Sequence, residues 1–579
     1  MKKFGKLYML AALLVAGAAF DACTADEESL IAQPEVQKTY TLTVNVGNGA
    51  DTRTLTEESG SLTASWNADD EVAVYKGEAK VGILKPTAAG ATRLKGEVTG
   101  VDVNDELTLK FQSDADYSAQ EGTLEYIDTH CSAAVATVTV DKIEGSDLYT
   151  SDAAFENQQS IFKFNLKYQD EALSVTPLTI TAGELTITVA PTEGKSELYV
   201  AIPAISEKTD FQFSATSGSD SYICVIGDAT VSAGKFYSVD LKMRKVVDLS
   251  KLEAAYVAQD GDVLTGKATD KYKISIAAGA TVTLRDVDIT SFDSEGPKYA
   301  GINCIGDATL VIEGENHVKG AYNECSGINI PANFTLTIEG TGKLTAESNG
   351  YGAGIGAGYY WGSAGNIIIN SGEIVAIGGG DCAGIGAGCE ASCGDITING
   401  GTVTATGGRE APGIGSGYHT SCGNITITNG TIEAIGGNSA AGIGAGYEYS
   451  SCGIIEIKGG EVTSTGGKQG AGIGSGYYSS SCGNIIISNG TVKAIGGEDG
   501  AGIGTGSTWY HGYQSSCGDI NISGGTVEAT KGGVATYDVG PGNGSRYGLG
   551  NCGTVTIGSG ITIKDKDGND AVIYVASTE

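Results

Sequence analysis

Hydrophobic and polar residues alternate one by one over several short stretches between residue 37 and about residue 245. The clearest examples are residues 40–46, 161–166 and 185–189. Alternation with a period of two is typical of strands buried on one face. Clusters of Gly, Asp, Ser and Asn separate such runs at intervals of roughly ten residues, which is the spacing of β-sandwiches. This part of the chain therefore predicts β-sandwiches and no long amphipathic helix.

The second half of the chain carries an internal repeat marked by the tripeptide Gly-Ile-Gly. Successive copies are 30, 29, 29, 30 and 30 residues apart. The central isoleucines are Ile355, Ile385, Ile414, Ile443, Ile473 and Ile503, with degenerate copies at Ile302 and Ile328 and a last copy at Val539. A fixed period of this length indicates a repeat architecture in which each unit stacks on the next.

Each unit contains three short apolar pieces, such as residues 424–427, 431–435 and 441–444, separated by Gly-Gly or Asn-Gly turns. The pieces alternate with period two and are rich in Ile, Val and Thr, so helical repeats fit poorly. Stacking is expected to align equivalent isoleucines in continuous columns. Two such columns are Ile425, Ile455 and Ile485, and Ile414, Ile443 and Ile473.

These patterns together predict an all-β chain in which a parallel β-helix (a β-solenoid) over residues 246–579 follows the sandwiches. The regular coils are expected to begin near Ile274. Residues 246–273 are then a lead-in that covers the first coil.

Composition and charge narrow the function classes. The 579 residues include 89 Gly but only 9 Pro, without a three-residue period, which excludes collagen. A hydrophobic content of 41% argues against a disordered chain. The net charge of −33 makes nucleic acid a poor partner, because such a chain repels phosphate backbones. Carboxylates could hold calcium, but no calcium-binding motif is present, so no cofactor or metal is expected.

The first residues read as an export signal. Lys2, Lys3 and Lys6 precede an apolar stretch at 7–20, which is too short to span a bilayer stably. Residues 1–22 are therefore predicted to be a signal peptide that ends at a lipobox-like Ala22-Cys23. A diacylated Cys23 would anchor the protein in the outer membrane. The alternative is an ordinary secretory signal with an incidental cysteine.

Residues 23–36 form an acidic linker. The cluster Asp26-Glu27-Glu28 resembles the surface-export signal of lipoproteins in fimbriate, Gram-negative anaerobes. The resemblance implies an outer-membrane lipoprotein that is exposed at the cell surface.

The region 37–245 resembles the fimbrillin-like proteins. The resemblance lies in the strand at 40–46, Thr52-Arg53-Thr54, the tryptophan and acidic turn at 65–74, and the later segments 160–166 and 234–241. It implies two transthyretin-like β-sandwiches in tandem. In pilus-forming members, a protease cuts after an arginine that follows the first strand, and a partner's strand fills the groove. Arg53 and Thr54 match that position, which implies other fimbrial subunits as partners. The alternative is that Arg53 is an ordinary loop residue.

The repeat region is similar to glycine-rich right-handed β-helix domains that are described as carbohydrate-binding. An aromatic turn follows most Gly-Ile-Gly copies, and a row of such rings could stack on sugar rings along a glycan chain. Alternatively, the rings are stacked purely for structural support. The candidate carbohydrate-binding residues are Tyr359, Tyr360, Trp361, Tyr418, Tyr447, Tyr449, Tyr477, Tyr478, Trp509 and Tyr510, with His419 and Tyr513 beside them.

Six cysteines share one repeat position: Cys393, Cys422, Cys452, Cys482, Cys517 and Cys552. A stack of small buried thiols is the favoured interpretation. Disulfides between adjacent coils are the second, because coil spacing falls within the Cα separation that a disulfide needs. A metal site comes third, since a linear column offers no tetrahedral cage.

No catalytic constellation stands out. Glu433 and Glu528 share a strand position, but Thr463 and Lys493 occupy it in the copies between them. The four histidines lie far apart in the sequence. We therefore expect no enzyme. The favoured function is adhesion or glycan binding at the cell surface, as an accessory or tip subunit of a fimbria. The alternatives are a structural surface protein that binds nothing, and then a polysaccharide-active β-helix enzyme.

Overall fold

The computed structural model describes residues 38–46, 56–58, 61–268, 272–290, 299–321, 324–359, 362–508, 513–544 and 548–575. The predicted signal peptide, the acidic linker, Cys23, Arg53 and Thr54 lie outside these residues. The chain divides into two compact units. The first contains residues 65–111 and 134–155 with strand β1, and the second contains 54–64, 112–133 and 156–579.

The first unit is a single sheet that closes on itself. Its strands pair in the order β10-β1-β6-β5-β4-β7-β9, and β9 pairs in turn with β10. The strands are β1 (Thr39–Asn45), β4 (Val72–Lys76), β5 (Ala79–Pro86), β6 (Arg93–Thr99), β7 (Glu106–Phe111), β9 (Ala134–Glu144) and β10 (Asp147–Thr150). Alternate residues point inward, where Trp66 packs edge-on against Phe111 and Phe155 at 5.6 and 5.5 Å between ring centroids.

The second unit begins with a two-layered sandwich. One layer holds β12 between β16 and β19, and the other runs β8-β15-β14-β17-β18-β20. Phe164 and Phe213 meet between the layers at 5.3 Å. Its strands are β8 (Ala119–Gln120), β12 (Gln159–Tyr168), β14 (Leu178–Ala182), β15 (Leu185–Val189), β16 (Glu197–Pro203), β17 (Ile205–Ser217), β18 (Asp220–Val231), β19 (Phe236–Lys242) and β20 (Arg244–Asp248).

Smaller elements complete this part of the second unit. They are the hairpin β2 (Thr56–Glu58) and β3 (Ser61–Thr63), the helix α1 (Leu124–His130), β11 (Glu156–Asn157), β13 (Glu171–Ala172) and the 3-10 turn Leu249–Lys251. Thr123 caps α1 by accepting a hydrogen bond from the amide of Tyr126. Within the described residues, no helix is long and apolar enough to cross a membrane.

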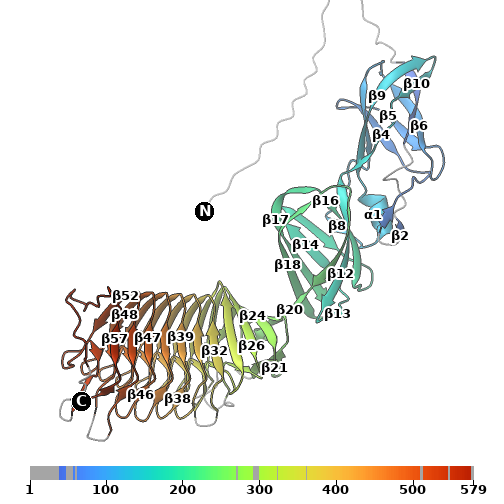
Figure 1. The fold of residues 1–579 in the computed structure, drawn as a ribbon. Helices are drawn as coiled ribbons and strands as arrows, with labels where there is room; N and C mark the ends of the chain where they lie inside the picture. Colours follow the sequence, from blue (N-terminus) through green and yellow to red (C-terminus); the bar gives the residue numbers. More distant parts are fainter. Residues whose placement is uncertain are drawn as a thin grey trace, which may run out of the picture. The chain divides into compact units, whose positions relative to one another are not determined.

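The rest of the second unit is the predicted parallel β-helix (Figure 1). Its first face consists of β22 (Val263–Lys267), β24 (Ala280–Ile289), β26 (Ala308–Glu313), β29 (Thr335–Gly340), β32 (Asn366–Ile369), β35 (Ile396–Ile398), β39 (Ile425–Ile427), β43 (Ile455–Ile457), β47 (Ile485–Ile487), β51 (Ile520–Ile522) and β57 (Val555–Ile557). Its second face consists of β27 (Glu315–Lys319), β30 (Lys343–Glu347), β33 (Glu373–Ile377), β36 (Thr402–Thr406), β40 (Thr431–Ile435), β44 (Glu461–Thr465), β48 (Thr491–Ile495) and β52 (Thr526–Thr530).

The Gly-Ile-Gly copies form the third face, and the Ser-Cys turns form a short fourth ladder. The third face consists of β21 (Tyr256–Ala258), β23 (Ile274–Ile276), β25 (Ile302–Cys304), β28 (Ile328–Asn329), β31 (Ile355–Gly356), β34 (Ile385–Gly386), β37 (Ile414–Gly415), β41 (Ile443–Gly444), β45 (Ile473–Gly474), β49 (Ile503–Gly504) and β53 (Val539–Gly540). The fourth ladder consists of β38 (Ser421–Cys422), β42 (Ser451–Cys452), β46 (Ser481–Cys482), β50 (Ser516–Cys517) and β56 (Asn551–Cys552).

The expected start of the coils near Ile274 was wrong. Strand β21 pairs in parallel with β23, and β22 pairs in parallel with β24. Residues 256–267 are therefore the first coil rather than a cover over it. They contribute the same backbone ladders without the Gly-Ile-Gly sequence that marks the later copies.

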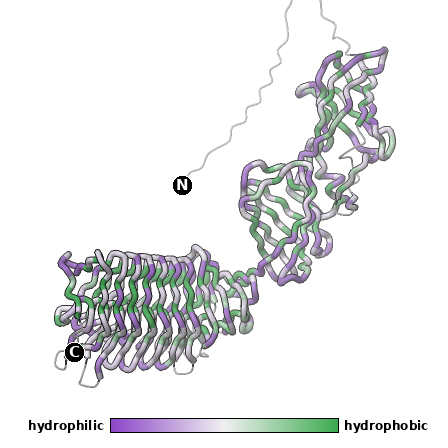
Figure 2. Tube along the Cα trace, viewed as in Figure 1, coloured by the Kyte–Doolittle hydropathy of each residue, from purple (hydrophilic) through white to green (hydrophobic). Residues whose placement is uncertain are grey.

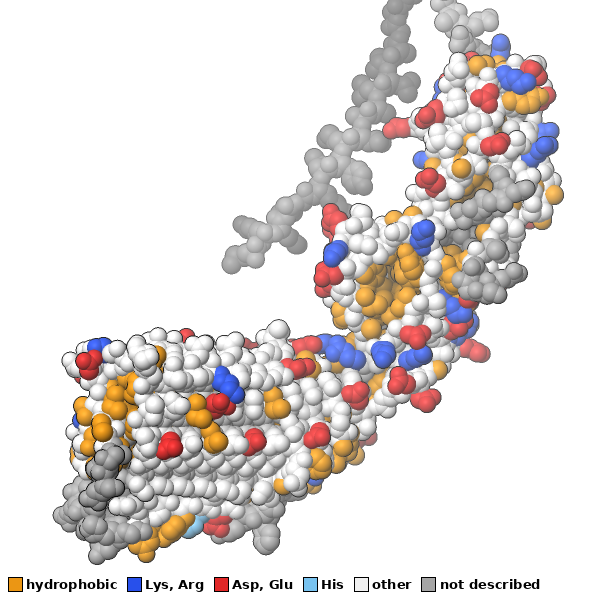
Figure 3. Space-filling view, in the orientation of Figure 1, with side chains coloured by type: hydrophobic (Ala, Val, Ile, Leu, Met, Phe, Trp, Pro, Cys, Tyr) orange, Lys and Arg blue, Asp and Glu red, His pale blue; other side chains and the backbone are white. Residues whose placement is uncertain are grey.

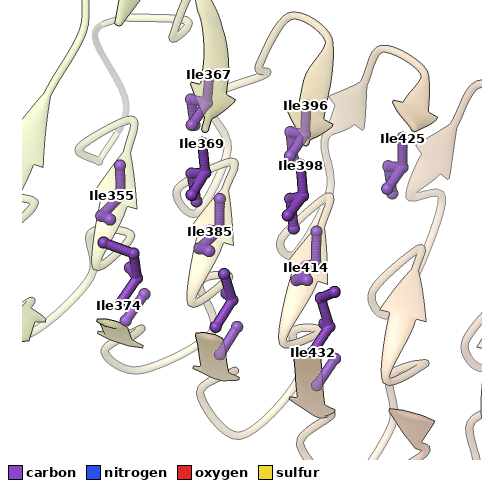
Figure 4. Packing of buried hydrophobic residues seen from close by; sticks show 14 of the residues in the cluster. Ile355, Ile367, Ile369, Ile374, Ile385, Ile396, Ile398, Ile414, Ile425 and Ile432 are labelled. Atoms are coloured by element: carbon purple, nitrogen blue, oxygen red, sulfur yellow. The ribbon is translucent and has the colours of Figure 1, made fainter. Parts of the chain in front are cut away.

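The predicted isoleucine columns are confirmed. Ile414, Ile443 and Ile473 pair in register along the third face and are fully buried. The matching column on the first face joins Ile425, Ile455 and Ile485. Figure 4 shows the earlier members of both columns pointing into the same interior, and Figure 2 shows hydrophobic residues at matching places in successive coils. The core is thus built by stacking, one coil at a time.

Glycine beside each of these isoleucines lets adjacent coils approach. Gly444 has φ +133°, and a Cβ there would lie 1.9 Å from the carbonyl oxygen of Gly474 in the next coil. Only glycine combines this backbone conformation with such a close approach. The tripeptide is therefore a requirement of the coil geometry.

The last coil is covered by residues 561–574. Ile573 forms a parallel bridge with Val539, and the Tyr574 amide donates to the Val539 carbonyl at 2.9 Å. Lys564 similarly bridges Glu528. Ile563 is buried against the final rungs. This segment, the terminal cover, occupies strand edges that would otherwise be open to pairing.

Candidate glycan-binding edge

The turn after each Gly-Ile-Gly copy places its aromatic residues along one edge of the β-helix. The backbone is left-handed at His419, Tyr449 and Tyr478, with φ of 53°, 52° and 62°. Such a turn directs neighbouring side chains to different sides. It therefore separates the aromatic residues into two rows, which we call the inner and the outer row.

The inner row consists of Tyr418, Tyr447 and Tyr477. Their rings stack from coil to coil, with centroids 5.7 and 5.6 Å apart and planes within 25° of parallel. Tyr477 is only 6% exposed, and the other two are partly buried. The inner row therefore closes the end of the thin core between the third face and the fourth ladder.

The outer row consists of His419, Tyr449, Tyr478 and Tyr513. Tyr449 lies 5.5 Å from His419 and 5.8 Å from Tyr478, and both contacts are edge-on. Tyr478 stacks on Tyr513 at 5.1 Å. Tyr449 is 51% exposed and Tyr513 is 39% exposed. Hydrophobic side chains are visible beside a histidine along this margin of the β-helix in Figure 3.

Glu448 connects the two rows. The Tyr418 hydroxyl donates a hydrogen bond to Glu448 Oε2 at 3.0 Å, and His419 Nε2 lies 3.3 Å from the same oxygen. Burial and this hydrogen bond raise the pKa of Tyr418 above its usual value. Burial also raises the pKa of Glu410. The edge thus offers carboxylate and hydroxyl groups beside aromatic faces, a combination that can bind sugar hydroxyls as well as sugar rings.

The other predicted aromatics are not part of these rows. The rings of Tyr359 and Tyr351 contact each other with centroids 5.4 Å apart, and both residues belong to a coil that precedes the two rows. The intervening copy, at Cys389, has no aromatic residue, so the row is interrupted there. Tyr360, Trp361, Trp509 and Tyr510 lie outside the described residues.

The six repeat cysteines are placed in one column. Cys422, Cys452, Cys482, Cys517 and Cys552 pair in register, and a bridge joins Cys393 to Cys422. All six are buried. The structure departs from the predicted thiol stack at one end, where Cys517 and Cys552 form a disulfide with Cα atoms 4.9 Å apart. The remaining four are thiols.

The candidate acidic pair is separated along the β-helix. The register runs from Glu433 through Thr463 and Lys493 to Glu528, so the two carboxylates lie three coils apart. Three coils correspond to about 14 Å. Paired glycosidase carboxylates lie roughly 5–9.5 Å apart. Among the described residues, no group of three His, Cys, Asp or Glu side chains is arranged to hold a metal ion.

The structure contains a polar cavity in the early coils that the sequence pattern did not predict. It encloses about 190 Å³ on the third face and is lined by Lys273, Tyr299, Asn303, Glu324 and Asn329 among others. The Asn329 side-chain amide donates to Asn303 Oδ1 at 2.8 Å. The signal was present in the degenerate repeats, where asparagine follows Ile302 and Ile328 in place of the usual glycine.

Comparisons with known proteins agree with the repeat architecture. The family model of the β-helix repeat matches residues 336–359, 367–389, 396–418, 425–447, 455–477, 485–507 and 520–545. Each segment runs from the first face to the turn after the third. A search of curated proteins finds no match.

Several solved structures are distantly similar. A candidate cell adhesion protein from Bacteroides ovatus is 12% identical, with a TM-score of 0.23, over 36% of this chain and 96% of its own. Another candidate cell adhesion protein, from Bacteroides uniformis, is 11% identical with a TM-score of 0.23, and the match covers 37% of this chain and 98% of that protein. The Bacillus anthracis TIE protein is 10% identical with a TM-score of 0.12, and the match covers 39% of this chain and 44% of that protein. Such values do not extend the neighbours' roles to this chain. The C-terminal part of the chain is built from β-helix repeats.

Proposed function

We propose that this protein is a surface adhesin that binds glycans along the outer aromatic row. The observation that carries the proposal is the contrast between the two rows on one edge. The inner row is largely buried and supplies the structural closure that the coils need. The outer row is exposed at Tyr449 and Tyr513, where it contributes little to that closure.

The three tyrosines of the outer row form one compact aromatic patch. Tyr449, Tyr478 and Tyr513 come from successive turns, and their ring centroids lie 5.1–6.4 Å apart. Aromatic faces at such intervals can contact the apolar faces of sugar rings. Glu448 and His419 supply hydrogen-bonding groups at the margin. The ligand class is therefore a glycan or glycoconjugate.

The site is proposed to bind its ligand without transforming it. Glu433 and Glu528 are about 14 Å apart by coil count, too far to flank one glycosidic bond. The outer row itself contains no pair of carboxylates. A structural surface protein without a ligand is the second candidate, because the inner row already accounts for part of the aromatic repeat.

The cellular setting belongs to the same proposal. A lipid on Cys23 would hold the protein in the outer membrane, and the acidic linker would direct it to the surface. Cleavage after Arg53 would allow it to join a fimbria as an accessory or tip subunit. Mass spectrometry of the membrane-bound precursor would test the anchor through an acylated Cys23, and mass spectrometry of purified fimbriae would test the cleavage through a new terminus at Thr54.

Glycan-array binding of the purified protein tests the ligand class. The decisive variant combines Tyr449→Ala, Tyr478→Ala and Tyr513→Ala, and the control is Tyr149→Ala, a tyrosine of the first unit with 39% exposure. We expect saturable binding that the triple variant loses and the control retains. Equal binding by the triple variant, or no binding by the unaltered protein, would contradict the proposal.

A further inference from the structure

The cysteine column contains more than the one bonded pair. Each of its cysteines lies directly above or below another in the neighbouring coil, because the fourth ladder pairs them residue for residue. At the upstream end, the sulfur atoms of Cys393 and Cys422 are 2.6 Å apart. In the middle, the thiol of Cys482 is hydrogen-bonded to that of Cys452. The close contacts therefore already divide the column into couples.

A row of six allows only one complete pairing between neighbours. The first must pair with the second, the third with the fourth and the fifth with the sixth. The bonded pair Cys517–Cys552 occupies the last of these positions. We propose that the column matures into three inter-coil disulfides, Cys393–Cys422, Cys452–Cys482 and Cys517–Cys552, once the protein is in an oxidising compartment.

The chemistry requires an external oxidant, which we assign to a small-molecule or protein disulfide. One cysteine thiolate attacks the external disulfide and releases one thiol. The neighbouring cysteine then displaces the second thiol and completes the bond. Each couple thus loses two protons and two electrons, and one external disulfide is reduced to two thiols.

Burial sets the time at which these bonds form. The thiolate is the reacting species, and the hydrogen bond with the neighbouring thiol, together with burial, raises the pKa of Cys422 and Cys482 well above the usual thiol value. Exchange is therefore slow once the coils have stacked. The bonds are expected to form while the coils assemble, when the sulfurs are still accessible.

The pairing has a specific mechanical consequence. A β-helix is held together mainly by contacts between successive coils. The three disulfides would join the six coils two by two. No covalent link would then connect the coil of Cys422 to that of Cys452, or the coil of Cys482 to that of Cys517. The Cys452–Cys482 disulfide would join the two coils whose turns carry Tyr449 and Tyr478. This inference rests on the coil register and not on the proposed glycan binding.

Peptide mapping of the full chain tests the pairing. The protein is unfolded, refolded in reduced and oxidised glutathione, alkylated under denaturing conditions and digested without reduction. Trypsin alone cannot resolve the pairs, because no Lys or Arg lies between Cys422 and Cys452. A second protease that cleaves after Glu433 or Glu448 separates them.

We expect three cross-linked peptide pairs, each lighter by two hydrogens than its reduced components. Alkylated thiols at Cys393, Cys422, Cys452 and Cys482 would overturn the inference, and so would a Cys422–Cys452 link. Cys452→Ser should leave Cys482 as an alkylated thiol and preserve the other two bonds. Cys304→Ser, at a buried cysteine of an earlier coil, should preserve all three. A changed pairing in the Cys304 variant would also contradict the inference.

Discussion

The inner and outer aromatic rows have the same origin and different surroundings. Both repeat once per coil, and their members lie within two residues of each other in the turns. Tyr477 is 6% exposed, whereas Tyr449 is 51% exposed. Aromatic residues with the same period can therefore be buried in the core or exposed at the surface, and the turn geometry decides which. Substitutions in the two rows should therefore differ in their effect on stability.

The largest effect should come from a change that breaks both rows together. Gly444→Ala places a Cβ 1.9 Å from the Gly474 carbonyl, at a backbone angle that alanine rarely adopts. We expect at least about 4 kcal/mol of lost unfolding free energy. Urea denaturation measures this loss. Gly533→Ala is the control, because its Cβ would meet nothing within 4 Å. Equal stability of the two variants would refute the close-approach argument.

Truncating the inner row should have the next largest effect. Tyr477→Ala removes a buried ring that stacks on Tyr447 at 5.6 Å. We expect a loss of about 2–3 kcal/mol, from the lost burial and the lost ring contact. Thermal unfolding monitored by circular dichroism gives the change. A value near zero would mean that the inner row does not close the core.

Alkaline pH should weaken the inner row through its hydroxyl groups. Burial raises the pKa of Tyr477 to about 12. A group whose pKa is raised on folding contributes stability that is present below its unfolded pKa, near 10, and is lost as the pH rises toward the folded value. Between pH 9 and pH 11.5, the unaltered protein should lose roughly 1–2 kcal/mol more than Tyr477→Phe. Identical losses in the two proteins would mean that ionisation of Tyr477 does not cause the loss of stability at alkaline pH.

The smallest effect on stability should come from the outer row. Tyr449→Ala removes an exposed ring, so we expect a change within about 0.5 kcal/mol. The same urea titration used for Gly444→Ala provides the value. A loss comparable to that of Tyr477→Ala would erase the distinction between the rows and favour the structural interpretation of all the tyrosines.

The β-helix could be predicted from the sequence because two periods occur together in it. Alternation within each piece marks the strands, and the 29–30-residue step marks the coils, so Ile414, Ile443 and Ile473 could be aligned in advance. The first coil was missed because Tyr256–Ala258 pairs through its backbone without the marker tripeptide. Likewise, alternation in the first unit predicted its strands but not that β9 and β10 would close the sheet.

The division of the tyrosines could not be predicted from spacing. Tyr447 and Tyr449 lie two residues apart in a turn, where left-handed backbone at Glu448 and Tyr449 decides which ring faces the core. Alternation rules do not apply in such turns. The couples of the cysteine column were hidden for a similar reason. Repeat spacing gives each of the four inner cysteines a neighbour on both sides, and it does not show that the close contacts lie at Cys393–Cys422 and Cys452–Cys482.

The terminal cover bears on the length of the β-helix. An open β-helix end could accept further rungs from another molecule, but Lys564 and Ile573 of the terminal cover already pair with the final strands of the second and third faces. Each added or deleted repeat would lengthen or shorten the rod by about 4.8 Å. Repeat duplication or loss would therefore change the length of the β-helix in discrete steps of one coil.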